Sequence, residues 1–246
     1  MIVTFTDFGY TAPYLGQIRL VLARHAPGIQ VIDLLTDAPA FNPRAAGYLL
    51  AALAPELPPG SVCLAVVDPG VGTDDRRPVV VRANGRWFVG PDNGLLHVVA
   101  QAAPDRDRWE IQWRPERLSA SFHARDLFAP VAARLAQGEW PRVRPLGWQA
   151  CDFEGWPQDL AEVVYVDAYG NCMTGLRATA LPSDIRLVAG GRVLARARTF
   201  AEVAAGTPFW YENANGLAEV AVSRGCAAEA LGLTIGTPIA VQGLPY

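Results

Sequence analysis

Segments typical of strands and of helices alternate along the first 135 residues, and this alternation restricts the possible folds more than any other feature. Short apolar runs predict buried strands at 2–5, 31–35 and 61–68. Apolar residues at helical spacing predict helices at 14–26 and 43–57. This order indicates an α/β domain with an open, mostly parallel sheet and flanking helices. In such domains, ligands bind at the carboxyl ends of the strands, and TDFG with Asp7 and DPGVG with Asp68 follow the first and third predicted strands.

The remaining elements of this region are a hairpin and two helices. Asn84-Gly85 separates two apolar strands, and this residue pair supplies the positive φ angles of a tight hairpin turn. We expect the helices at 94–101 and 126–136.

The chain changes character between Gly138 and Leu160, where three tryptophans and three prolines interrupt the periodicity. We therefore expect an α/β domain over 1–140, a linker over 141–160 and a second domain over 161–246. The second domain contains short strand-like segments with glycine-rich turns and no long helix. This pattern predicts a smaller antiparallel β domain or barrel.

Composition excludes several classes of function. All 21 basic residues are arginines, which excludes lysine Schiff bases and a Walker-type phosphate lysine. A formal net charge of −3 without a basic block argues against binding of nucleic acid or an anionic membrane surface. Four scattered cysteines and three histidines lack zinc-site spacing, so we expect no metal. Without a signal pattern or a membrane-spanning apolar run, we expect a cytoplasmic protein.

The segment AVVDPGVGTDDRRP, residues 65–78, has the most chemical content. Asp68 leaves an apolar strand, Gly70 and Gly72 expose the backbone, and Arg76 and Arg77 follow. A fixed carboxylate, bare amides and a guanidinium make a polar pocket with both signs of charge. The alternative is a plain turn between strands, closed by an Asp–Arg pair.

Two further segments place polar groups at element ends. His123, in SASFHARDLFAP, precedes the predicted helix at 126–136 and can handle a proton near neutral pH, or it can be a purely structural histidine. In Asp167-Ala168-Tyr169-Gly170-Asn171, a ring lies between polar groups, which suits recognition of a nucleobase. Turn formation is the competing interpretation of that segment.

Taken together, TDFG, VVDPGVGT with RRP, GPDNGLL, SFHARDLFAP and DAYGN resemble, in order and spacing, the motifs of the S-adenosylmethionine (SAM) hydroxide adenosyltransferases, or SAM hydrolases. The same superfamily contains SAM-dependent fluorinases and chlorinases. The resemblance implies attack of water or hydroxide at the ribose 5′ carbon of SAM, giving adenosine and methionine without a cofactor. It also implies a homotrimer, in which the second domain of one subunit completes the site of a neighbour.

Carried over by motif, the catalytic residues of the family correspond to Asp68, Arg76 and His123. A carboxylate, a guanidinium and an imidazole suit the orientation and activation of a water molecule.

The resemblance also implies five substrate contacts. Asp7 would bind the ribose hydroxyls, and Phe41 would lie against the sugar and adenine. From the neighbouring subunit, Tyr169 would stack on adenine, Asn171 would read its edge, and Asp167 would meet the methionine ammonium.

The chain departs from the family pattern at several positions. Ala12 and Ala214 replace an acidic residue and a serine at the methionine end of the site, and Arg77 competes with Arg76 for the catalytic role. A binding protein for SAM or adenosine without turnover is therefore an alternative. A halogenase is a second, which would have tyrosines in place of Asp68 and His123.

Overall fold

The structure is a computed structural model that describes residues 1–73 and 76–242 of the 246-residue chain. The chain consists of two compact units, Met1–Trp156 and Pro157–Tyr246. Among the described residues, no helix is both long and apolar enough to cross a membrane.

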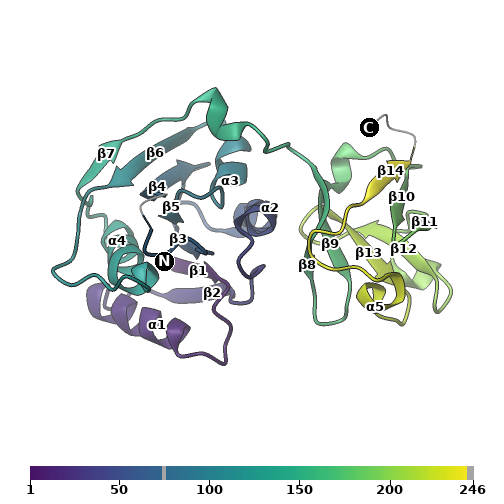
Figure 1. The fold of residues 1–246 in the computed structure, drawn as a ribbon, viewed down its shortest axis with the longest axis horizontal. Coiled ribbons are helices and arrows are strands. Elements are labelled where there is room, and N and C mark those ends of the chain that lie inside the picture. The colour runs from purple at the N-terminus through teal and green to yellow at the C-terminus, as the bar shows by residue number, and fades with distance from the viewer. Residues whose placement is uncertain (74–75, 243–246) are drawn as a thin grey trace. The chain divides into compact units, whose positions relative to one another are not determined.

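The first unit is built on a seven-stranded sheet with the order β2-β1-β3-β5-β4-β6-β7 (Figure 1). Its strands are β1 (Ile2–Thr6), β2 (Val31–Leu35), β3 (Val62–Val66), β4 (Pro78–Ala83), β5 (Arg86–Pro91), β6 (Arg106–Ile111) and β7 (Val143–Pro145). β2, β1, β3 and β5 pair in parallel, and β6 shares their direction because it is antiparallel to β4, which is antiparallel to β5. Five of these seven strands therefore run one way, which confirms a mostly parallel sheet.

Helices cover both faces of this sheet (Figure 1). They are α1 (Tyr14–His25), α2 (Pro43–Leu53), α3 (His97–Gln101) and α4 (Ala129–Ala136). α1 packs on α4 on one face, and α2 contacts α3 on the other. One apolar core of the unit joins α1 and α4 to apolar residues of β1, β3 and β5.

Local sequence explains where these elements begin and end. Asn42 caps α2, since its Oδ1 accepts the Ala45 N–H at 3.0 Å, and Pro43 occupies the first turn as predicted. α2 is shorter than the predicted 43–57 because Pro55 lacks an N–H, and a 3₁₀ turn, Ala54–Glu56, replaces its end. Asn84 and Gly85, with φ angles of 49° and 70°, form the predicted hairpin turn between β4 and β5.

The predicted helices at 94–101 and 126–136 differ from the structure at their first turns. Gly94, with φ of 99°, lies in a turn before α3. A π-helical turn, Ala124–Phe128, precedes α4, and π-helical geometry is frequent at functional sites.

Residues 141–156, which the sequence analysis assigned to a linker, belong to the first unit. β7 pairs with β6, and Trp156 packs against Gly94 and stacks on Tyr48 with ring centroids 6.5 Å apart.

The second unit consists of two antiparallel sheets, one with the order β12-β13-β9-β8 and one with the order β11-β10-β14. Their strands are β8 (Leu160–Val166), β9 (Cys172–Arg177), β10 (Arg186–Ala189), β11 (Arg192–Leu194), β12 (Pro208–Glu212), β13 (Leu217–Val222) and β14 (Ala240–Gln242). A separate apolar core around Trp210 and one short helix, α5 (Ala227–Leu231), complete the unit. The predicted antiparallel β domain is confirmed.

Candidate active site

Two carboxylates leave the same edge of the first sheet. Asp7 directly follows β1, and Asp68 follows β3 after one residue. β1 and β3 are parallel neighbours, with Thr6 opposite Val66, so both acids are delivered to one edge. Burial raises the pKa of Asp7, and the charge of Asp68 adds to that rise, while the N–H of Phe41 opposes it.

Asp68 and Arg76 form a two-point ion pair. Arg76 Nε donates to Asp68 Oδ1 at 2.7 Å, and Arg76 Nη2 donates to Asp68 Oδ2. Both side chains are only 6% exposed, so the pair has a nearly fixed geometry. For Arg77, the alternative, the structure shows no bond to Asp68; its charge adds a small part to the lowering of the pKa of Glu110 on β6, which is caused first by the hydrogen bond from Arg144.

His123 completes the cluster. Its Nδ1 lies 3.4 Å from Arg76 Nη2, and a guanidinium can only donate, so Nδ1 accepts in this contact. In the neutral imidazole, the ring proton is then on Nε2. Burial lowers the pKa of His123 below its ordinary value of 6.5, Arg76 lowers it further, and Asp68 partly opposes them. The imidazole is therefore neutral at physiological pH.

Close packing of backbone holds the cluster together. Gly72 has φ of 84°, and a Cβ there would lie 2.4 Å from the carbonyl oxygen of Ala120, so only glycine fits. This approach joins the turn after Asp68 to the loop that leads to His123.

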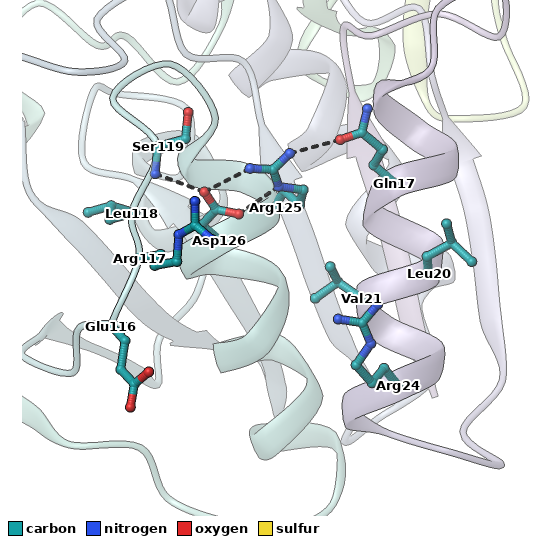
Figure 2. A pocket seen from close by; sticks show the side chains of 10 residues that line it. All are labelled: Gln17, Leu20, Val21, Arg24, Glu116, Arg117, Leu118, Ser119, Arg125 and Asp126. Carbon is teal, nitrogen blue, oxygen red and sulfur yellow. Dashed lines mark hydrogen bonds and ion pairs between the residues drawn. The ribbon is translucent and has the colours of Figure 1, made fainter.

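The loop before His123 is also held by Asp126. Asp126 Oδ2 accepts the Ser119 N–H at 2.8 Å, and its other oxygen accepts Arg125 Nε at 2.6 Å. Arg125 in turn donates to Gln17 of α1 at 2.9 Å (Figure 2). These contacts border a separate surface cavity of about 790 Å³ and fix the π-helical turn to α1.

A cavity of about 340 Å³ opens beside the cluster, lined by Asp7, Phe41, Asp68 and His123, with Phe8, Tyr14 and Phe122 forming an aromatic wall. Phe41 has φ of 58° and is 80% exposed, and its N–H lies 3.3 Å from Asp7 Oδ2. A left-handed conformation is costly for phenylalanine, and such strain is frequent in ligand-binding segments.

The other three predicted residues lie in the second unit, around one tight turn. Asp167 Oδ1 accepts the N–H groups of Tyr169 and Asn171, each at 2.9 Å, and Asp167 Oδ2 accepts the Asn171 amide at 3.1 Å. Tyr169 is left 81% exposed. The turn lines a cavity of about 530 Å³ together with Arg224.

One buried acid, which the sequence pattern did not predict, is bonded to Tyr211 in the lining of that cavity. Glu219, on β13, is 2% exposed and accepts hydrogen bonds from Tyr211 at 2.5 Å and from Asn213 at 2.7 Å. Burial raises its pKa, and the charge of Asp167 contributes to the rise. A lone acidic residue within the apolar run LAEVAV was the available signal.

Within residues 1–73 and 76–242, no group of three or more His, Cys, Asp or Glu side chains is placed to hold a metal ion. The candidate site thus consists of a carboxylate, a guanidinium and a neutral imidazole beside an aromatic-walled cavity, which suits the holding of one small oxygen nucleophile.

Known proteins share both sequence and fold with this chain. An "(R)-S-adenosyl-L-methionine hydrolase" from Thermus thermophilus is 40% identical, with coverage of 95% of this chain and 96% of the relative. A protein of the same description from Salinispora arenicola is 37% identical over 96% of this chain and 95% of its own.

Two solved structures resemble this chain in fold. An uncharacterized conserved protein from Thermotoga maritima matches with a TM-score of 0.82 and 30% identity, covering 98% of this chain and 99% of its own. A conserved hypothetical protein from Thermus thermophilus matches with a TM-score of 0.75 and 37% identity, covering 98% of each chain. The models of the SAM hydroxide adenosyltransferase N-terminal and C-terminal domains match residues 2–144 and 161–240. The chain belongs to the SAM hydroxide adenosyltransferase family.

Proposed function

We propose that this protein hydrolyses SAM by attack of water, in its hydroxide form, at the ribose 5′ carbon, and releases adenosine and methionine. The observation that supports this most is the chain of contacts from Asp68 through Arg76 to His123 beside one cavity. Membership of the family supports the same reaction.

The chemistry assigns a distinct task to each residue of the cluster. The sulfonium leaves as a neutral thioether, so no acid is needed, and the difficulty is the supply of a nucleophile in line with the breaking bond. Arg76 and the Nε2–H of His123 donate to the nucleophilic oxygen and favour hydroxide over water. Asp68 fixes the direction of the guanidinium. The new C–O bond replaces the C–S bond, and one proton goes to solvent.

Substrate positioning falls to the remaining predicted residues. Asp7 has lone pairs free to accept both ribose hydroxyls, and the exposed ring of Phe41 lies at the same cavity. No cofactor takes part in this scheme, since SAM itself carries the leaving group.

Isotope labelling tests the reaction. Incubation of the purified protein with SAM in H₂¹⁸O should place the label in the 5′-hydroxyl of adenosine and none in methionine. Binding of SAM without products would instead indicate a binding protein, and 5′-chloroadenosine in high chloride would indicate a halogenase.

Substitution tests the assignment of residues. Arg76→Ala and His123→Ala should each lower turnover by about 10²-fold or more while SAM still binds, on the usual scale of acid–base and electrostatic contributions. Arg77→Ala is the matched control, because Arg77 is also an arginine and adjoins Arg76 in sequence, but the two bonds to Asp68 come from Arg76. Equal losses from Arg76→Ala and Arg77→Ala would refute the assignment.

We further propose a homotrimer, in which Asp167, Tyr169 and Asn171 of one subunit face the first-unit cavity of a neighbour. The exposed rings of Phe41 and Tyr169 support this, because each is a large apolar surface beside a polar pocket, as expected for two sides of a nucleobase site.

Complementation tests the shared site. His123→Ala and Tyr169→Ala variants, each weakly active alone, should regain activity after mixing and reassembly, because some sites then combine two intact halves. The double variant is the control and should regain none. A monomer in analytical ultracentrifugation, or no regain, would refute the shared site.

A further inference from the structure

The turn that follows β5 lies between the two backbone segments that carry the ion pair. β5 lies between β3 and β4 in the sheet. Asp68 follows β3, and Arg76 precedes β4 by two residues. The Asp68–Arg76 pair therefore spans the end of β5, and the turn at Asp92-Asn93 is in position to contact both flanks.

Hydrogen bonds join this turn to both flanks of the pair. Asn93 Nδ2 donates to the carbonyl of Val67 at 2.9 Å, and Val67 directly precedes Asp68. The N–H of Asp92 donates to the carbonyl of Arg77 at 2.8 Å, directly after Arg76. The parallel pairing of β3 with β5 ends at Leu64 opposite Val89, so the Asn93 amide continues the connection beyond the strand ladder.

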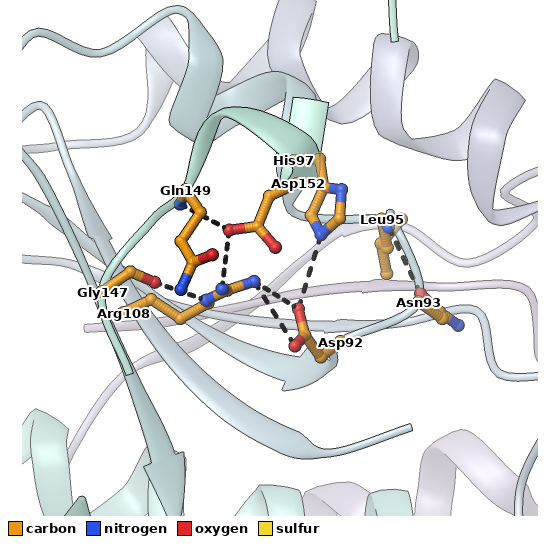
Figure 3. Close-up of polar contacts among 8 residues, drawn as sticks. All are labelled: Asp92, Asn93, Leu95, His97, Arg108, Gly147, Gln149 and Asp152. Carbon is orange, nitrogen blue, oxygen red and sulfur yellow. Dashed lines mark hydrogen bonds and ion pairs between the residues drawn. The ribbon is translucent and has the colours of Figure 1, made fainter. Parts of the chain in front are cut away.

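The orientation of the Asn93 amide is defined by its two contacts. Its Oδ1 accepts the Leu95 N–H at 3.3 Å (Figure 3). Its Nδ2 donates to the carbonyl of Val67. A flipped amide would place oxygen against oxygen at Val67 and nitrogen against N–H at Leu95, so one orientation alone satisfies both.

A nearly buried network of ion pairs holds the Asp92-Asn93 turn in place (Figure 3). The carboxylate of Asp92 accepts Arg108 Nη1 at 3.2 Å and lies 3.4 Å from His97 Nε2. Arg108 is 5% exposed and also donates to Asp152 at 2.9 Å and to the carbonyl of Gly147 at 2.9 Å. Burial raises the pKa of Asp92, but His97 and Arg108 together bring it below its ordinary value. These contacts fix the position of Asp92, and with it the turn that carries Asn93.

We propose that Asn93 is a positioning residue, whose amide holds the Val67 carbonyl and so sets the direction in which Asp68 meets Arg76. This inference rests on the proposed function, in which the pair orients the nucleophile. Asn93 does not line the reaction cavity, so its effect is on geometry and not on substrate contact. Misplacement of a catalytic group by about 1 Å can cost about 10²-fold in rate.

Asn93→Asp removes the donor. Aspartate keeps the size of the side chain and the acceptor for the Leu95 N–H, but it loses the donor to Val67 and adds a negative charge. We expect kcat for SAM to fall by about 10-fold or more, with KM and adenosine affinity little changed, because the substrate contacts are intact.

Gln137→Glu is the matched control, since Gln137 Nε2 also donates to a backbone carbonyl, that of His25 at 2.7 Å, in the same unit. This variant should change stability slightly and leave kcat unchanged. A wild-type kcat in Asn93→Asp, or parallel changes in both variants, would overturn the inference.

A second measurement does not depend on turnover. The pKa of His123 responds to both Arg76 and Asp68, so a displaced pair should shift the His123 titration in NMR spectra of Asn93→Ala, which adds no charge. Gln137→Ala should leave that titration unchanged. An unshifted His123 in Asn93→Ala overturns the inference even if wild-type protein proves inactive on SAM, whereas inactivity alone contradicts only the proposed function.

Discussion

A double-mutant cycle on Asp68 and Arg76 tests whether the pair acts as one electrostatic unit. Each side chain is 6% exposed, so Arg76→Gln leaves a carboxylate in a nearly buried position without its partner charge. Removal of one partner from such a pair costs about 3–5 kcal/mol of unfolding free energy. Asp68→Asn in the same chain removes that uncompensated charge, and the two amides can bond to each other. We expect a coupling energy of about 2–3 kcal/mol.

Urea unfolding followed by tryptophan fluorescence is a suitable assay, because six of the seven tryptophans lie in the first unit and only Trp210 lies in the second. The turnover of the double variant should not recover together with its stability. The double variant lacks the guanidinium that orients hydroxide, so its turnover should stay about 10²-fold low although its stability recovers.

The Arg82–Asp107 pair is the control for this cycle. Arg82 Nη2 lies 2.5 Å from Asp107 Oδ2, so this is also a direct ion pair, but its side chains are 44% and 45% exposed. Solvent screening should limit its coupling to about 1 kcal/mol or less. Additive losses at Asp68 and Arg76, or equal coupling in both pairs, would refute the argument that burial makes the catalytic pair a unit.

Three more outcomes follow from the geometry. The lowered pKa of His123 keeps the imidazole of the free protein neutral down to pH values below 6.5, so kcat/KM should fall only below that pH, and an acid limb above it would contradict the neutral-imidazole assignment. Gly94→Ala should lower the thermal unfolding midpoint, because the new Cβ would lie 2.1 Å from the Trp156 ring and the residue has a φ of 99°. An unchanged midpoint would show that the Trp156 ring can move aside at no cost in stability. Phe41→Ala should raise KM while the unfolding free energy changes by less than about 0.5 kcal/mol, because Phe41 is 80% exposed; an unchanged KM would exclude substrate contact.

The sequence predicted the edge of the sheet where the acids meet, because both Asp7 and Asp68 follow short apolar strands. The same pattern did not reveal β6 or β7. In β6, RDRWEI, four of the six residues are charged, and one of them, Arg108, is buried and forms ion pairs with Asp92 and Asp152. A buried arginine is stabilised by distant partners, which local periodicity does not encode.

The boundary near 140–160 illustrates a second limit. Tryptophans and prolines interrupt helical and strand patterns, which favours a linker, yet Trp156 fills the space above Gly94 and Trp148 stacks on Arg108 with 4.2 Å from the guanidinium carbon to the ring centre. Such irregular segments are ordered by packing against the folded surface of the first unit. Glu219 was missed for the same reason, since Tyr211 and Asn213 make its burial possible from outside its own strand.

The charges at the proposed reaction site restrict how it can accelerate hydrolysis. The proposed site has two acidic side chains, Asp7 and Asp68, against one guanidinium, that of Arg76, and this excess of acidic groups attracts the sulfonium of SAM. This attraction weakens as the C–S bond breaks and the positive charge is lost, so it favours the bound substrate over the transition state. Rate acceleration must therefore come from the nucleophile, through the donors of Arg76 and His123 that hold hydroxide in line. The same loss of charge weakens the hold on the thioether, which favours release of methionine after each turnover.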